Sequence, residues 1–253
     1  MSQGRQYIPD LRAAVPQGFR GLPQIADVPC AQGCTACVDA CPTDAIASLH
    51  PVQIDLGRCV FCDDCVPVCP VKKLSFSAYC HTGSAVREDL LISHARPTPP
   101  PIAVSNSLRA LFGRSLRLRS VSAGGCNACE LELNALSNVN FDLGRYGIEF
   151  VASPRHADAL VLSGPLTRNM VEALRLCYDA MPAPRFVIAF GACAVSGGLF
   201  ADSAAVEREF LAENVPTLYI PGCPPHPLTF VNAVLDLLGI ALPHVTADPQ
   251  QGA

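Results

Sequence analysis

The sequence predicts two domains of different classes: a small α+β domain rich in cysteines, and an α/β domain built on a parallel sheet. Three observations support this prediction. Fourteen of the 253 residues are cysteines, and twelve of them fall into three sets with the spacing of metal ligands. The second half of the chain alternates apolar, strand-like runs with helical stretches, which is typical of a parallel α/β sheet. A proline-rich stretch separates the two halves.

The first two cysteine sets are compact runs, each followed directly by proline. They comprise Cys30, Cys34, Cys37 and Cys41 before Pro42, and Cys59, Cys62, Cys65 and Cys69 before Pro70. A cage of four thiolates suits either zinc or an iron–sulfur cluster. Structural zinc sites use separate C-x2-C pairs, whereas the run C-x2-C-x2-C-x3-C-P is typical of bacterial iron–sulfur proteins. The spacing therefore favours iron.

An internal repeat relates the two runs. A shift of 28 residues superimposes the last three cysteines and the proline of the first run on those of the second. Residues 28–80 resemble two-cluster ferredoxins, in which the fourth cysteine of each run binds the other cluster. The resemblance implies one [4Fe–4S] cluster on Cys30, Cys34, Cys37 and Cys69, and a second on Cys41, Cys59, Cys62 and Cys65. The first run departs from the family pattern at Cys30, because it opens C-x3-C.

A disulfide-rich secreted protein is the main alternative for so many cysteines. The first residues, MSQGRQYIPDLRAAVPQG, contain neither an apolar signal-peptide core nor a twin arginine, so we expect reduced thiols. The net charge of −4 does not indicate nucleic-acid binding. Residues 228–242 are the most apolar stretch, but Asn232 and Asp236 interrupt it, so no membrane-spanning segment is expected.

Residues 81–106 are expected to form an interdomain linker. The apolar periodicity lapses there, and four prolines between residues 97 and 101 favour an extended path. Residues 107–119 follow, with four arginines among leucines. A short amphipathic helix followed by a strand is expected in this segment. Such a basic segment can lie on a membrane surface, but we favour a covering or docking segment whose arginines are solvated.

Five strands and four helices are expected in the α/β domain. The strands are at 116–122, 148–152, 159–162, 185–190 and 217–220, and the helices at 128–137, 169–180, 203–213 and 227–238. The third cysteine set (Cys126, Cys129, Cys193 and Cys223) then lies just beyond the carboxyl ends of the first, fourth and fifth strands. Because open α/β folds collect their sites at this edge of the sheet, we expect the four thiols to converge.

Four strings carry a resemblance to a known family. They are GGCNACELE (124–132), SPRHADALVLSGPLTRNM (153–170), GACAVSGG (191–198) and PGCPPHP (221–227). Over about residues 108–240 the chain resembles the small subunit of group 4, energy-converting [NiFe] hydrogenases, which is homologous to the 20-kDa-type subunit of respiratory complex I. The formate hydrogenlyase and hydrogenase-4 branch is nearest. The resemblance implies a flavodoxin-like fold and a proximal [4Fe–4S] cluster on Cys126, Cys129, Cys193 and Cys223, hence three [4Fe–4S] clusters in the chain.

Differences from related families narrow the range of families that the chain resembles. The first pair here is C-x2-C, the hydrogenase form, whereas complex I subunits usually have two adjacent cysteines. Periplasmic uptake hydrogenases have further cluster ligands toward the C-terminus, and no cysteine follows Cys223 here. A fused N-terminal ferredoxin is a variation on the group 4 plan, where that domain is usually a separate subunit.

No catalytic residue is expected in the chain itself, but several residues near the cysteines have two interpretations. Glu132 is interpreted either as a proton relay or as a residue that fixes the cluster loop. For Glu130, the alternative interpretation is a carboxylate exposed at the surface. His226 either tunes the cluster by hydrogen bonding or has a structural role. Cys80 and Cys177 fit no set and are expected to be buried core thiols.

The resemblance implies an electron-transfer small subunit of a membrane-associated [NiFe]-hydrogenase-type complex, an oxidoreductase whose active site lies in a partner chain. The expected partners are a [NiFe] large subunit or a complex I 49-kDa-like subunit, membrane subunits and a soluble electron donor or acceptor. We expect a cytoplasmic location, on the inner face of the cytoplasmic membrane. Two alternatives are a complex-I-like quinone or ferredoxin oxidoreductase subunit without a nickel partner, and a non-catalytic scaffold that carries clusters.

The expected organisation of the chain has five parts. They are an N-terminal extension (1–29), a two-cluster ferredoxin domain (30–80), the linker (81–106), the hydrogenase-small-subunit-like domain (107–242) and a tail (243–253).

Overall fold

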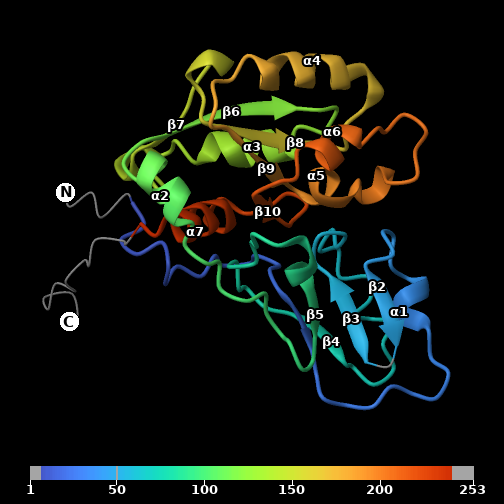
Figure 1. Cartoon of the computed structure of the whole chain (residues 1–253). Coiled ribbons are helices and arrows are strands. Elements are labelled where there is room, and N and C mark those ends of the chain that lie inside the picture. Colours follow the sequence, from blue (N-terminus) through green and yellow to red (C-terminus); the bar gives the residue numbers. More distant parts are fainter. Residues whose placement is uncertain (1–6, 50, 241–253) are drawn as a thin grey trace, which may run out of the picture.

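The computed structural model describes residues 7–49 and 51–240, in which two units are stacked (Figure 1). The larger unit, at the top of Figure 1, is an α/β structure, and the smaller unit below it is α+β. The expected tail, residues 243–253, lies outside the described residues.

A five-stranded parallel sheet forms the centre of the larger unit. Its strands are β6 (Leu116–Ser122), β7 (Ile148–Phe150), β8 (Ala159–Ser163), β9 (Phe186–Phe190) and β10 (Leu218–Ile220), in the spatial order β10-β9-β8-β6-β7. When β6 is counted as the first strand, this order reads 2-1-3-4-5 from β7, which is the order of flavodoxin-like folds. The prediction of a parallel α/β domain is therefore confirmed.

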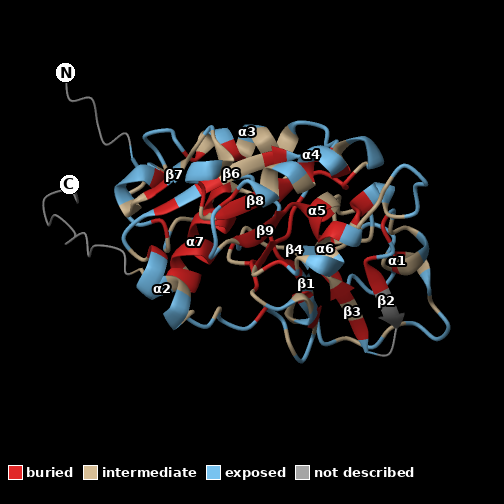
Figure 2. Ribbon diagram, turned by 45° about the horizontal axis from the view of Figure 1, so that its top comes forward, coloured by how far each residue is buried: buried red, intermediate tan, exposed pale blue. Residues whose placement is uncertain are grey.

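Helices cover both faces of this sheet. One face packs against α2 (Asn106–Phe112), α3 (Ala128–Ala135) and α7 (Pro227–Leu238), and the other against α4 (Arg168–Asp179) and α6 (Glu209–Glu213). Every residue of α7 except Asp236 is buried (Figure 2), so this apolar helix is part of the core. Within the described ranges, no helix combines the length and apolarity that a membrane span requires.

Two helices differ from the sequence prediction. The prediction of a helix at 203–213 is wrong for the first half of that range, because within it only Glu209–Glu213 is helical. Val206 instead forms an isolated bridge with Thr167, which fixes the preceding residues as turns. An unexpected short helix, α5 (Ala192–Ser196), follows β9 directly and carries Cys193.

The smaller unit is built from two similar halves. Strand β1 (Pro23–Ile25) pairs antiparallel with β4 (Leu74–Phe76), and β2 (Ile46–Leu49) pairs with β3 (Val52–Asp55). A one-turn helix, α1 (Ala36–Asp39), lies in the first half. The 28-residue repeat is visible in the backbone, because left-handed residues recur at that interval: Gly33 and Phe61 (φ 68° and 56°), and Asp44 and Lys72 (φ 49° and 51°).

The first part of the segment expected to be a linker is folded. It contains the 3-10 helix η1 (Arg87–Leu90) and strand β5 (Leu91–Ser93), which pairs with β3 and extends the sheet of the smaller unit. The buried side chains of Leu90 and Ile92 explain why this stretch packs despite its lack of long periodicity. Residues 97–105 form neither helix nor strand, and we propose that they are the linker proper.

Candidate iron–sulfur centres

Four thiols from both halves of the smaller unit meet at one cavity. This cavity is lined by Cys30, Cys34, Cys37 and Cys69. Burial raises the pKa of Cys37, and the other three thiols raise it further because nearby thiolates repel one another. Cys30 lies at this cavity although its spacing to the next cysteine departs from the ferredoxin pattern.

A second set of four thiols lines another cavity of the smaller unit. Its members are Cys41, Cys59, Cys62 and Cys65. Burial raises the pKa of Cys59 and of Cys65 to about 12, and the neighbouring thiols of the set add to the shift. Each cavity thus combines three cysteines of one run with the last cysteine of the other run.

Backbone amides donate hydrogen bonds to several of these sulfur atoms. The amides of Ala45 and Lys73 each lie 3.2 Å from a sulfur, that of Cys41 and Cys69 respectively. The two bonds are related by the 28-residue repeat. Because hydrogen bonds to sulfur stabilise negative charge, they are one of the means by which a protein tunes a cluster potential.

The third thiol set lies at the carboxyl edge of the parallel sheet. Cys126 and Cys129 follow β6, Cys193 lies in α5 after β9, and Cys223 follows β10. Burial raises the pKa of Cys193 to about 11, with smaller contributions from Cys223 and Cys126. Cys126 and Cys223 are exposed while the other two thiols are partly buried, so one side of this site is open at the protein surface.

Two glycines make room for sulfur in this third set. A Cβ atom on Gly191 would lie 2.7 Å from the Cys129 sulfur, and one on Gly198 would lie 3.2 Å from the Cys193 sulfur. Gly191 also has a φ of 92°, which side chains rarely adopt. These positions therefore require glycine for both conformation and space.

The chemistry of all three donor sets fits iron–sulfur clusters. Among the described residues, no three or more side chains are close enough to share a single metal ion. A cubane needs a wider arrangement, since each of its four thiolates binds a separate iron atom. In the smaller unit, four thiols line each of two cavities, with amide donors beside the sulfurs. In the larger unit, four thiols lie at one edge of the sheet, with glycines beside two of the sulfurs.

The three sets follow one another in space. Burial is the main cause of the raised pKa of Cys65, and Cys37 from the first set contributes to it. In the same way, the pKa of Cys223 is raised mainly by burial and also by Cys62 from the second set. Phe61, next to Cys62 of the second set, also lines the same cavity as Cys223, so the second set lies between the first set and the set on the parallel sheet.

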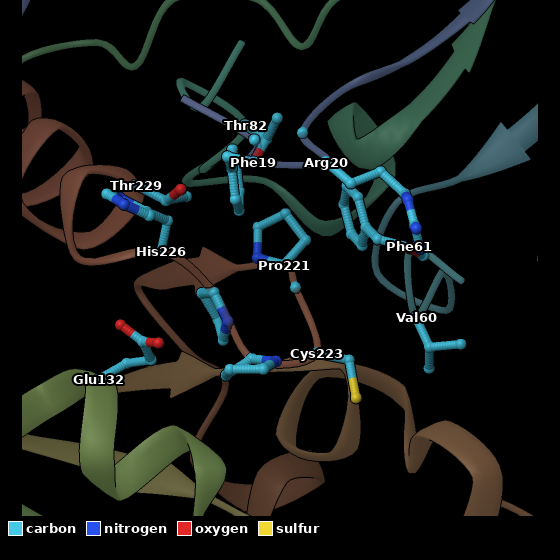
Figure 3. Close-up of a pocket in the computed structure, with 15 residues that line it drawn as sticks. Phe19, Arg20, Val60, Phe61, Thr82, Glu132, Pro221, Cys223, His226 and Thr229 are labelled. Carbon is cyan, nitrogen blue, oxygen red and sulfur yellow. Dashed lines mark hydrogen bonds between the residues drawn. The ribbon is translucent and has the colours of Figure 1, made fainter. Parts of the chain in front are cut away.

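A cavity of about 260 Å³ lies between the two units beside Cys223 (Figure 3). Glu132 lines it, and burial raises the pKa of this carboxyl. His226 also lines it, and its Nδ1 atom accepts a 3.1 Å hydrogen bond from the Leu228 amide at the start of α7. The His226 ring packs between Phe19 and Phe141, which gives this histidine a structural role.

Glu130 is held in place instead of projecting from the surface. The Ser163 hydroxyl donates a 2.5 Å hydrogen bond to its carboxylate. Burial opposes ionisation, but hydrogen bonds from Ser122 and Ser163 lower the pKa of Glu130. Of the two unassigned thiols, Cys80 is buried in the core as expected, while Cys177 is only partly buried.

Sequence reasoning missed Arg208. Its guanidinium donates hydrogen bonds to three consecutive carbonyl oxygens of α5, those of Cys193 (3.1 Å), Ala194 (2.7 Å) and Val195 (3.0 Å). No motif marks this arginine, because it lies directly before α6 and its partners are 13 to 15 residues away.

Two family models match the chain. The model described as "NADH ubiquinone oxidoreductase, 20 Kd subunit" matches residues 126–237, and that described as "4Fe-4S dicluster domain" matches residues 29–73. A probable membrane-bound hydrogenase subunit of Pyrococcus furiosus is 38% identical over 125 residues, which are 49% of this chain and 74% of that relative.

Two further relatives cover similar parts of the chain. An NADH-quinone oxidoreductase subunit of Desulfovibrio desulfuricans is 44% identical over 128 residues, with 49% of this chain and 68% of the relative covered. Formate hydrogenlyase subunit 7 of Escherichia coli is 37% identical over 154 residues, with 58% and 60% covered. A chain of the solved archaeal membrane-bound sulfane sulfur reductase has a TM-score of 0.43 and 24% identity over 53% of this chain and 73% of that chain.

The fold and these matches define an iron–sulfur subunit of an oxidoreductase, in which a ferredoxin-type domain precedes a parallel-sheet domain. The chain belongs to the family of the 20-kDa subunit of NADH ubiquinone oxidoreductase.

Proposed function

We propose that the chain is the electron-transfer small subunit of a membrane-associated [NiFe]-hydrogenase-type complex, and that it relays electrons through three [4Fe–4S] clusters. The observation that carries this proposal is the succession of three four-thiol sites. Cys37 and Cys41, which are four residues apart, line the first and the second cavity, and Phe61, next to Cys62, lines the cavity that Cys223 also lines. A relay requires such a succession, whereas a store of clusters does not.

Each site has a proposed set of ligands. Cys30, Cys34, Cys37 and Cys69 would hold the first cluster, Cys41, Cys59, Cys62 and Cys65 the second, and Cys126, Cys129, Cys193 and Cys223 the proximal one. When bound, a [4Fe–4S] cluster supplies one-electron transfer. The chain's own residues hold the thiolates, donate amide hydrogen bonds to sulfur and keep part of each site away from water.

The partner is proposed to be a nickel–iron large subunit that meets the open side of the third site, where Cys126 and Cys223 are exposed. Three features support nickel: the C-x2-C form of the first pair, and the similarity to the Pyrococcus hydrogenase subunit and to the formate hydrogenlyase subunit. We propose Glu132 as a proton relay, because its partly buried carboxyl lines the cavity beside Cys223. Membrane subunits would keep the complex on the inner face of the cytoplasmic membrane, where a soluble redox partner reaches the ferredoxin domain.

A second candidate function is supported by the similarity to the NADH-quinone oxidoreductase subunit of Desulfovibrio desulfuricans. In that case the partner would be a complex-I-like subunit without nickel. The sequence of the large subunit encoded with this chain distinguishes the two, because two C-x2-C pairs in it indicate a nickel site and their absence indicates the alternative.

The proposal predicts the metal content of the purified chain. Three sites with four iron atoms each should give about twelve iron and about twelve sulfide per chain after anaerobic reconstitution. Mössbauer spectra should show cubane clusters. Stoichiometric zinc with only background iron would contradict the proposal.

A further inference from the structure

The N-terminal segment that precedes β1 is attached to both units. On the larger unit, Leu11 is fully buried, and its carbonyl oxygen accepts a 3.1 Å hydrogen bond from the Asn232 side chain of α7. Arg12 forms an ion pair with Asp236 of the same helix. The segment then enters the smaller unit, where β1 pairs with β4. Residues 8–25 therefore connect the two units by direct contacts, in addition to the connection that the linker provides.

Phe19 and Arg20 lie between these two attachments, at the cavity beside Cys223 (Figure 3). The centroid of the Phe19 ring is 5.0 Å from that of His226 in the larger unit. The Arg20 side chain extends instead along Phe61 of the smaller unit. Consecutive residues of one segment thus contact opposite walls of the same cavity.

Arg20 binds the backbone of the loop that carries Cys62. Its Nη1 atom donates hydrogen bonds to the carbonyl oxygens of Phe61 (2.9 Å) and Cys62 (2.8 Å). Its Nη2 atom lies 3.2 Å from the Asp63 carboxylate, but both side chains are nearly half exposed, so solvent screens this ion pair. The two carbonyl contacts are therefore the specific part of the interaction.

The backbone of the Phe61–Asp63 loop has an unfavourable conformation, so contacts from outside the loop are needed to stabilise it. Phe61 and Asp63 both have left-handed backbone angles, with φ values of 56° and 70°. This region is unfavourable for residues with a Cβ atom. The equivalent of Phe61 in the first half of the unit is Gly33, which adopts a φ of 68° without that cost. Of these two loops, the one that faces the larger unit has a left-handed phenylalanine and a bound arginine.

We propose that Arg20 is a positioning residue that holds the Phe61–Asp63 loop, and with it Cys62, at the cavity that Cys223 also lines. Arg20 would thereby set the rate of electron transfer between the two units, because the rate of electron tunnelling falls steeply with distance. This inference rests on the proposed function, since it requires clusters on both sides of the cavity.

The test replaces Arg20 by glutamine in the full chain, with Arg175→Gln as a matched control. Arg175 forms a comparable exposed ion pair with Glu213, and neither residue lines the cavities beside the cysteine sets. Neither change removes a thiol, so both variants should keep the wild-type iron content. The readout is the magnetic interaction between the proximal cluster and its neighbour in the fully reduced chain. It is measured by EPR as the extra splitting that the signal of the proximal cluster gains when the neighbouring cluster is also reduced.

Arg20→Gln should lose most of this interaction, Arg20→Lys should restore part of it, and Arg175→Gln should equal the wild type. A wild-type interaction in Arg20→Gln at full iron content would overturn the inference. If Arg20→Gln does not fold, Arg20→Lys decides: a weaker interaction than in the wild type is expected, and an unchanged one overturns the inference. A wild-type chain that binds no iron would instead refute the proposed function itself.

Discussion

The Arg208 guanidinium donates a 3.1 Å hydrogen bond to the carbonyl oxygen of Cys193, at the beginning of α5. The same side chain binds the next two carbonyl oxygens, so one cation holds most of this short helix. Its positive charge also favours the Cys193 thiolate, although burial is the larger influence on that pKa. Arg208 therefore links the position of a proposed ligand to the charge around it.

Replacement of Arg208 by methionine should affect both properties. Loss of the charge-assisted hydrogen bonds should reduce the free energy of unfolding by about 2 kcal/mol. Loss of a nearby positive charge should lower the midpoint potential of the proximal cluster, measured by EPR redox titration. Arg208→Lys keeps the positive charge, so it should change the midpoint potential less than it changes the free energy of unfolding. Replacement of the exposed Arg175 by methionine should change neither quantity. An unchanged potential in Arg208→Met would contradict this role.

Gly191→Ala should exclude the proximal cluster without removing a ligand. Its Cβ atom would lie 2.7 Å from the Cys129 sulfur, in a backbone conformation that alanine disfavours. Reconstituted Gly191→Ala should therefore bind about four fewer iron atoms per chain than the wild type. Gly144→Ala is the matched control, because a Cβ atom there meets nothing within 4 Å. Full iron content in both variants would show that the sulfur is placed differently.

The chain without clusters should become less stable as the pH rises. Burial raises the pKa of Cys59 and Cys65 to about 12 and that of Cys193 to about 11. In the unfolded chain, thiols ionise near pH ~8.5. Above that pH the unfolded state releases protons that the folded state retains, so the free energy of unfolding falls until the folded thiols also ionise.

Urea denaturation under anaerobic conditions at pH 7 to 10 measures this effect. The midpoint of the cluster-free chain should decrease above pH ~8.5, while that of the iron-loaded chain should lack this decrease, because metal-bound thiolates are already deprotonated. Parallel pH profiles for the two forms would argue against buried thiols as the iron ligands.

The sequence predicts the features of this protein that depend on local patterns. Ligand spacing and the 28-residue repeat predict the ferredoxin-type unit, and apolar runs that alternate with helical stretches predict the parallel sheet. The position of Cys193 beyond the fourth strand follows from that pattern, because parallel strands place their carboxyl ends at one edge.

Features that depend on contacts between distant residues were not predictable in this way. Glu130 is paired with Ser163, which is 33 residues away, and only the fold brings β8 to α3. Strand β5 is too short to produce a periodic signal and forms because β3 offers an open edge. The attachment of Leu11 to α7 spans 221 residues, so no local pattern indicates it.

The role of the proximal site in electron transfer can be measured in the assembled complex after a Cys193→Ala change. The change removes one of four proposed thiolates of the proximal cluster, whereas Cys177→Ala removes a partly buried thiol outside the three sets, at a cost of about 1 kcal/mol. Cys193→Ala should abolish electron transfer between H2 and the acceptor, while dithionite should still reduce the ferredoxin clusters. Cys177→Ala should leave electron transfer nearly unchanged. Near-normal H2-linked turnover in the Cys193→Ala complex would contradict the account, because electrons would then bypass this site.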